Sequence, residues 1–274
     1  MPLTFIKIGR IFYGLCLIGL GFQQFQYGDF RPVFAPDWPG WLHHSVLAYI
    51  FGAALVLAGG TIALAKNARK VALIIATVFL LFFLLFHFVF LSLVSPDKFS
   101  LGGWTNALKE LALSGGALIV AGSYQQPNTV TNDSFFSWLE KLIPFGRFFF
   151  GFMLACFGID HFLYAQFVAT LVPSWIPGSM FWTYFAGIAL FGAGVAIILN
   201  IRIKQVAMLT AIMIFVWFLV LHIPRGMADP EGLKGNEITS VFQALGFAGV
   251  LLVLSLNTSE SRTLAVPFPN KSTS

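Results

Sequence analysis

The chain has 274 residues, of which 58% are hydrophobic and only 10% are charged, and its mean hydropathy is +0.84. A soluble domain is typically about 45–50% apolar and about 25% charged. So little charge cannot cover a water-facing surface, which excludes a soluble enzyme, a nucleic-acid-binding protein and a disordered chain. The composition predicts a polytopic membrane protein whose first partner is the lipid bilayer.

Eight apolar runs are long enough to cross a membrane, since a helical span needs roughly 20 residues. Helices are the form expected for them, because open sheet edges cannot be satisfied in lipid. We therefore predict an all-α fold with eight transmembrane helices, near residues 5–25, 44–65, 71–93, 105–123, 146–166, 181–200, 204–223 and 240–257.

The basic residues predict the orientation, because cytoplasmic loops carry an excess of Lys and Arg. Eleven of the sixteen fall at the N-terminus, in the even-numbered loops or in the tail, and five fall on the other side. The loop at 66–70, Lys-Asn-Ala-Arg-Lys, is the clearest cluster. Both termini are therefore expected in the cytoplasm. Basic residues beside membrane spans also account for the net charge of +5.

The sequence repeats itself. The run Gly9-Arg10-Ile11-Phe12-Tyr13-Gly14 matches Gly146-Arg147-Phe148-Phe149-Phe150-Gly151 at an offset of 137, and an offset of 135 then relates His87 to His222. We interpret this as a tandem duplication. It predicts two parallel four-helix bundles, residues 1–123 and 144–257, joined by a polar cytoplasmic linker at 124–143 and followed by a flexible polar tail at 258–274.

Polar side chains inside the spans gather at one depth, near the outer ends. Such residues are costly in lipid and indicate function by default. In the second half they predict a ligand-binding pocket open to the outer face, to which the loop after the first span of that half adds a Trp. The predicted pocket residues are Asp160, His161, Tyr164, Trp175, His222, Arg225 and Gln243. The first-half counterparts are Gln23, Gln24, Tyr27, Trp38, His87 and Glu110.

We expect His161 and His222 to bind a polar head, with Asp160 fixing the tautomer of one imidazole. Phenylalanines are expected to line the apolar part, namely Phe149, Phe152, Phe157 and Phe162. No spaced ligand motif predicts a metal site. The sequence has neither a haem-attachment motif nor a Gly-rich dinucleotide loop, so it indicates no resident redox cofactor.

Several motifs of the second half resemble those of the DoxX-like family of bacterial membrane proteins. They are Gly146-Arg147-Phe148, Gly158-Ile159-Asp160-His161-Phe162, Val172-Pro173-Ser174-Trp175-Ile176-Pro177 and Tyr184-Phe185-Ala186-Gly187. The small members have four spans, so the chain resembles two such units fused. It departs from the family pattern at Ile188 and Ala53, where a Glu is frequent, and at Gln23-Gln24, which replaces the Asp-His pair.

The resemblance implies a protein of the bacterial inner (plasma) membrane with a quinone-linked redox association. Our first hypothesis is a non-catalytic accessory protein that binds a quinone or a similar amphiphile from the outer leaflet. Any electron transfer would then need a redox partner protein to supply the cofactor. The alternatives are a structural or assembly protein whose polar cluster only locks helix packing, and a carrier of a small solute between the halves. No residue is assigned a catalytic role.

Overall fold

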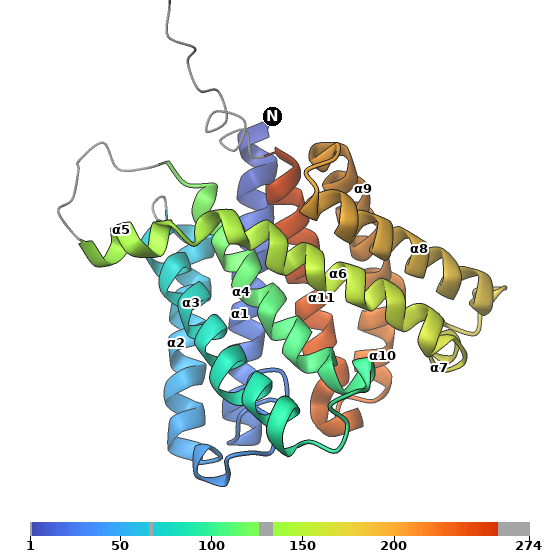
Figure 1. The fold of residues 1–274 in the computed structure, drawn as a ribbon, viewed down its shortest axis with the longest axis horizontal. Coiled ribbons are helices and arrows are strands. Elements are labelled where there is room, and N and C mark those ends of the chain that lie inside the picture. Colours follow the sequence, from blue (N-terminus) through green and yellow to red (C-terminus); the bar gives the residue numbers. More distant parts are fainter. Residues whose placement is uncertain (1, 66–67, 126–133, 257–274) are drawn as a thin grey trace, which may run out of the picture.

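The computed structural model describes residues 2–65, 68–125 and 134–256, and every regular element in them is a helix (Figure 1). The expected tail at 258–274 lies outside these residues. The α-helices are α1 (Pro2–Tyr27), α2 (Ser45–Leu64), α3 (Arg69–Phe82), α4 (Thr105–Gly122), α5 (Ser134–Glu140), α6 (Gly146–Leu163), α7 (Ala165–Leu171), α8 (Ser179–Ile198), α9 (Ile203–Trp217), α10 (Ile223–Ala228) and α11 (Gly232–Leu256).

Seven helical segments of the described chain are long and apolar enough to cross a membrane. They are Leu3–Tyr27, Ser45–Leu64, Arg69–Val94, Ser134–Leu163, Ser179–Ile198, Ile203–Ala228 and Gly235–Leu256. This confirms the all-helical class and a composition suited to a multi-pass membrane protein. The eighth expected span, α4, differs because Asn106, Lys109 and Glu110 lie in its first two turns. Fourteen of its residues are buried, so protein surrounds it.

The fourth long helix of each half packs against the first helix of the other half. The two helices α4 and α11 lie in the centre, with α2 and α3 on one side and α8 and α9 on the other (Figure 1). A Cβ on Gly9 of α1 would lie 2.5 Å from the carbonyl oxygen of Gly249 in α11. Likewise, a Cβ on Gly115 of α4 would lie 2.7 Å from that of Gly146 in α6. The halves therefore interlock, whereas the sequence suggested two self-contained bundles.

Within each half, the first two long helices cross at two glycine pairs. A Cβ on Gly14 of α1 would lie 2.5 Å from the Gly59 carbonyl oxygen of α2, and one on Gly21 would lie 2.7 Å from that of Gly52. The equivalent pairs between α6 and α8 are Gly151 with Gly194 and Gly158 with Gly187. Small residues at these positions let the backbones approach closely, as in many membrane helices.

Two helices continue into wider π-helical turns at matching places. Helix α3 is followed by η2 (Phe83–Phe88) and η3 (Phe90–Val94), and α9 is followed by η6 (Phe218–His222). Each of η2 and η6 carries a histidine in its last turn, His87 or His222. Such turns often occur at functional sites. Short 3₁₀ turns complete the described elements at Gly40–Leu42, Leu101–Trp104 and Ile143–Phe145.

Part of the segment expected to be a linker is helical. Residues 134–140 form α5, which packs against α3. Its Leu139 is buried, and its Glu140 accepts a 2.8 Å hydrogen bond from Nε of Arg69. Arg69 Nη1 also donates to the carbonyl oxygens of Ala121 and Tyr124, at 3.0 and 2.9 Å. Because residues 134–140 form a packed helix, the expected linker is shorter than predicted. Its residues 126–133 lie outside the described chain.

A candidate ligand-binding cavity

A cavity of about 580 Å³ lies in the second half, within the size range of ligand pockets, about 300–1,000 Å³. Side chains of α6, α7, α8, α9 and α11 form most of its wall, and the start of α4 closes it from the first half. Helices α7 and α10 place it toward the end of the bundle away from the N-terminus (Figure 1).

Six of the seven predicted site residues line this cavity. They come from α6, α10, α11, one π-turn and the junction between α6 and α7, and they are Asp160, His161, Tyr164, His222, Arg225 and Gln243. Trp175 does not line it, and its side chain is 68% exposed. The loop that carries Trp175 turns this ring outward, which suits an interfacial tryptophan rather than a pocket residue.

His161 is oriented by the backbone and not by Asp160. Its Nδ1 lies 2.7 Å from the carbonyl oxygen of Phe157, one helical turn earlier. A carbonyl oxygen can only accept, so Nδ1 carries the proton and Nε2 of the neutral ring remains an acceptor. The expectation that Asp160 fixes the tautomer is wrong for His161. Oδ1 of Asp160 is instead buried without a hydrogen-bond partner among the described residues.

Helix α11 supplies the facing polar wall. Gln243 is 2% exposed, and neither its Nε2 nor its Oε1 has a partner in the described chain. Glu237 receives two hydrogen bonds from Arg225, from Nη2 at 2.5 Å and from Nε at 3.1 Å. This bidentate pair joins α10 to α11 and holds both charges at the cavity edge. Oδ1 of Asn236 is also buried and unpartnered there.

The first half contributes to the same cavity. Lys109 of α4 lines it together with Ser100, Gly102 and Thr105. The hydroxyl of Tyr164 at the end of α6 accepts a 3.2 Å hydrogen bond from the backbone N–H of Gly102 and lies 3.1 Å from Oγ of Ser100. These contacts tie the loop before α4 to the rim, so the cavity belongs to both halves.

The apolar wall differs from the predicted one. Of the four expected phenylalanines only Phe157 lines the cavity. Phe152 and Phe162 are 50% and 45% exposed on the outer face of α6, and Phe149 packs beside Phe145 with ring centroids 6.2 Å apart. At about 100° per residue, positions 149, 152, 157 and 162 spread over roughly 220° of the helix circumference, so their side chains cannot all face one cavity. Aromatic rings from other helices line it instead, among them Trp182, Trp217 and Phe247.

Sequence reasoning also missed several polar residues of the cavity. On α11 the lining positions Asn236, Ser240, Gln243, Ala244 and Phe247 follow the spacing of one helix face. That periodicity, traced back from Gln243, is the signal that could have found them. Lys109 gave no such signal, because only the tertiary fold brings α4 to the second half. Among the described residues, no group of three His, Cys, Asp or Glu side chains could hold a metal ion.

The first-half counterparts form internal contacts instead of a shared pocket. Gln23 donates to the Gly235 carbonyl oxygen at 3.1 Å and accepts from Thr239 at 2.9 Å. Tyr27 donates to Glu231 at 3.0 Å. Gln23 and Tyr27 therefore bind to the second half, whereas the remaining four have partners within the first half. Gln24 accepts from the backbone N–H of Arg31, Trp38 stacks near Phe90, and Nε2 of His87 lies 3.1 Å from the Val33 carbonyl oxygen and 3.5 Å from Glu110.

The loop between α1 and α2 fills the corresponding space in the first half. Phe30 and Phe34 are 4% and 0% exposed and pack on Phe51. At an offset of 137 their counterparts are Phe167, which is 61% exposed, and Leu171, and both line the cavity. The segment between α1 and α2 is therefore packed inward, whereas the matching segment of the second half forms α7 and lies at the edge of the cavity.

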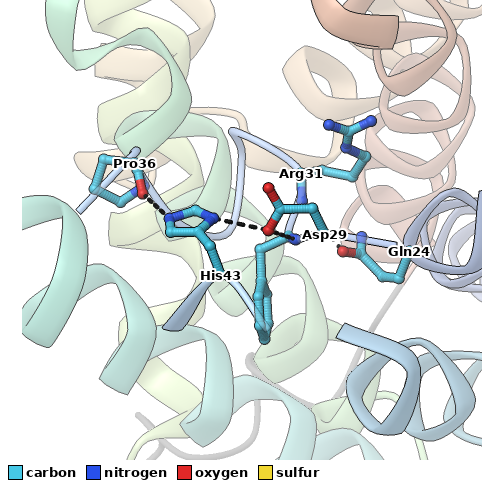
Figure 2. Close-up of polar contacts among 6 residues, drawn as sticks. Gln24, Asp29, Arg31, Pro36 and His43 are labelled. Atoms are coloured by element: carbon cyan, nitrogen blue, oxygen red, sulfur yellow. Dashed lines mark hydrogen bonds and ion pairs between the residues drawn. The ribbon is translucent and has the colours of Figure 1, made fainter. Parts of the chain in front are cut away.

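Polar contacts connect the two ends of the loop between α1 and α2, as Figure 2 shows. Nδ1 of His43 lies 2.7 Å from Oδ1 of Asp29, and its Nε2 lies 2.9 Å from the carbonyl oxygen of Pro36. The same Asp29 oxygen accepts from the backbone N–H of Phe30 at 2.7 Å. Burial also lowers the pKa of Arg31, whose guanidinium lies 3.7 Å from the ring centroid of Tyr27. These contacts hold both ends of the loop.

A family model described as a domain of unknown function (DUF8561) matches residues 150–245. No curated protein and no solved structure matches the chain. The matched segment begins in α6 and ends in α11, and it contains the cavity residues from Met153 to Ala244. Lys109 and its neighbours in the first half lie outside it.

Proposed function

We propose that the chain is a membrane protein that binds a small amphiphile in this cavity, head inward and tail toward lipid. The observation that carries the proposal is Gln243, an amide that is 2% exposed and has both polar atoms unpartnered at the wall of a 580 Å³ cavity. Buried polar atoms are normally satisfied by protein, water or a ligand. The aromatic and aliphatic wall suits the apolar part of the same molecule.

A quinone is the amphiphile that the resemblance to DoxX-like proteins favours. Its ring fits a cavity with Phe157, Trp182 and Trp217 in the wall, and a hydroxyl of its reduced quinol form would donate to a ring nitrogen of His161 or His222. On this proposal the protein is an accessory of a redox system in the bacterial inner membrane. Any electron transfer needs a partner protein to supply the redox cofactor, because cofactors carry this chemistry and the sequence has neither a haem-attachment motif nor a Gly-rich dinucleotide loop.

The proposal includes eight spans with both termini in the cytoplasm and two tandem DoxX-like units in parallel. Two observations support the repeat. The glycine pairs between α1 and α2 recur between α6 and α8, and His87 and His222 both lie in the last turn of a π-helical segment. The eighth span would be α4, whose polar first turns point into the protein and not toward lipid.

Mass spectrometry of organic extracts tests the binding proposal. Wild-type protein purified in detergent is compared with the His161→Ala/His222→Ala double variant and with Trp175→Ala, a control outside the cavity. We expect one defined amphiphile in the wild type and in Trp175→Ala, and its loss from the double variant. Bulk lipid alone, equal in all three, would overturn the proposal, and reduced thermal stability of the double variant would then assign the polar cluster to helix packing.

A further inference from the structure

We infer that the cavity selects a neutral head that carries hydroxyl groups, and that it discriminates against heads that only accept hydrogen bonds and against charged heads. This inference rests on the proposed function and names the class of its ligand. Three features of the lining carry it: the unpaired acceptors, the unpaired amide and the balance of charge.

Acceptors dominate the unpaired polar atoms of the lining. Oδ1 of Asp160 and Oε1 of Gln243 are buried without a partner among the described residues. Nε2 of His161 is an acceptor in the neutral ring, because Nδ1 is directed to the Phe157 carbonyl oxygen. A ketone or ether head would leave all of these unpaired, whereas a hydroxyl group donates to one of them.

The amide of Gln243 adds a second requirement. Its Nε2 is a donor without a partner, beside an Oε1 that is an acceptor without a partner. A hydroxyl group can both donate and accept, so it can satisfy either atom. A primary ammonium head can only donate, and a quaternary ammonium head can neither donate nor accept, so both would leave Nε2 unpaired. A site built to hydrogen-bond a hydroxyl rejects the analogue that lacks it, because its own buried groups then stay unpaired.

The formal charges of the lining balance. Arg225 and Glu237 neutralise each other through two hydrogen bonds, which leaves the cation Lys109 and the carboxyl group of Asp160 in the same cavity. Adding a carboxylate or an ammonium head would leave one uncompensated charge in a poorly solvated volume. A neutral head adds none. The lining therefore suits phenols, quinols and other neutral lipids with free hydroxyls, so of the two forms of a quinone it favours the reduced quinol over the oxidised ketone form.

Two probes that differ by one methyl group test the inference. Binding of 4-decylphenol and of 4-decylanisole to the full-length wild-type protein in detergent is measured by titration calorimetry. Their rings and tails are the same, but only the phenol can donate. We expect the phenol to bind at least about tenfold more tightly, which corresponds to about 1.4 kcal/mol. Decanoate and decyltrimethylammonium should bind more weakly than the phenol.

The variant Gln243→Leu locates the discrimination, with Gln166→Leu on exposed α7 as its control. We expect the phenol preference to fall in Gln243→Leu and to persist in Gln166→Leu. Equal affinities of the wild type for phenol and anisole would overturn the inference but leave the proposed function standing. Failure of all four probes to bind would overturn the proposed function itself. The probe comparison uses wild-type protein, so it decides the matter even if Gln243→Leu does not fold.

Discussion

Lys109 and Glu110 are adjacent in α4, yet their side chains serve different halves of the protein. Lys109 lines the cavity of the second half, whereas Glu110 is fully buried with Oε2 3.5 Å from Nε2 of His87 in the first half. Neighbouring residues of an α-helix point about 100° apart, so one helix between two halves can face both. Helix α4 is therefore a shared wall.

Replacing Lys109 should change which charge the cavity accepts. In Lys109→Met the carboxyl group of Asp160 loses its balancing cation, so a cationic head should bind better than in the wild type. We expect the affinity for decyltrimethylammonium to rise about tenfold relative to 4-decylphenol, or about 1.4 kcal/mol. Calorimetry with both probes measures this ratio. The control Glu110→Gln faces the other half, and a similar shift there would contradict the assignment of Lys109 to the cavity.

Adjacent glycines of α2 should respond differently to the same substitution. A Cβ on Gly59 would collide with the Gly14 carbonyl oxygen of α1, whereas one on Gly60 would meet nothing within 4 Å. We expect Gly59→Ala to lower the free energy of unfolding by about 1–3 kcal/mol, a typical cost of overpacking. Gly60→Ala should be neutral or stabilising by up to about 1 kcal/mol, since Ala favours helix. Thermal unfolding in detergent compares them, and equal effects would argue against the close crossing.

Two phenylalanines at matching positions of the halves should differ in their contribution to stability. Phe30 is 4% exposed with its ring centroid 5.3 Å from that of Phe51, whereas its counterpart Phe167 is 61% exposed. We expect Phe30→Ala to cost about 3–5 kcal/mol, the usual loss for a buried Phe. Phe167→Ala should stay within about 0.5 kcal/mol, as surface substitutions do. A large loss in both would mean that α7, which carries Phe167, is also packed inward.

The predicted orientation can be read from two single cysteines. Gly40 has open space around it in the loop after α1, and Ala65 is exposed at the far end of α2. The native Cys16 and Cys156 are buried. We expect a membrane-impermeant maleimide added to intact cells to label Gly40→Cys and to leave Ala65→Cys unlabelled until the membrane is opened. The reverse pattern would place the N-terminus outside.

The depth of each site residue along its helix could be predicted from the sequence, but the direction in which its side chain points around the helix could not. Asp160, His161 and His222 were expected at one depth because the rise per helical residue is constant, and they line one cavity. Which face each residue presents depends on which helices become neighbours. That packing brings Lys109 into the cavity wall and leaves Trp175 outside it. The hydrophobic periodicity of a single segment carries no information about which helices become its neighbours.

The same distinction holds for the fold. Hydrophobic runs indicated the long helices well, since their length and apolar content are local properties. Helix α5 was missed because its Leu139 is buried only once α5 packs against α3 in the tertiary fold. The inward packing of Phe30 was missed for the same reason, because its contact with Phe51 forms only in the tertiary fold. The matching residue of the second half, Phe167, is exposed, so the repeat did not predict this burial.

Because α4 packs against α6 and α11 packs against α1, the chain cannot be cut between its halves without exposing buried helix faces. Residues 1–123 alone would retain α4 but lose α6, against which Gly115 packs, and α1 would lose the Gly249 contact of α11. A half expressed by itself would therefore expose two interfaces of matching shape. A second copy could cover both by placing its fourth helix on the first helix of its neighbour, which makes a reciprocal two-fold dimer the assembly expected of a single unit.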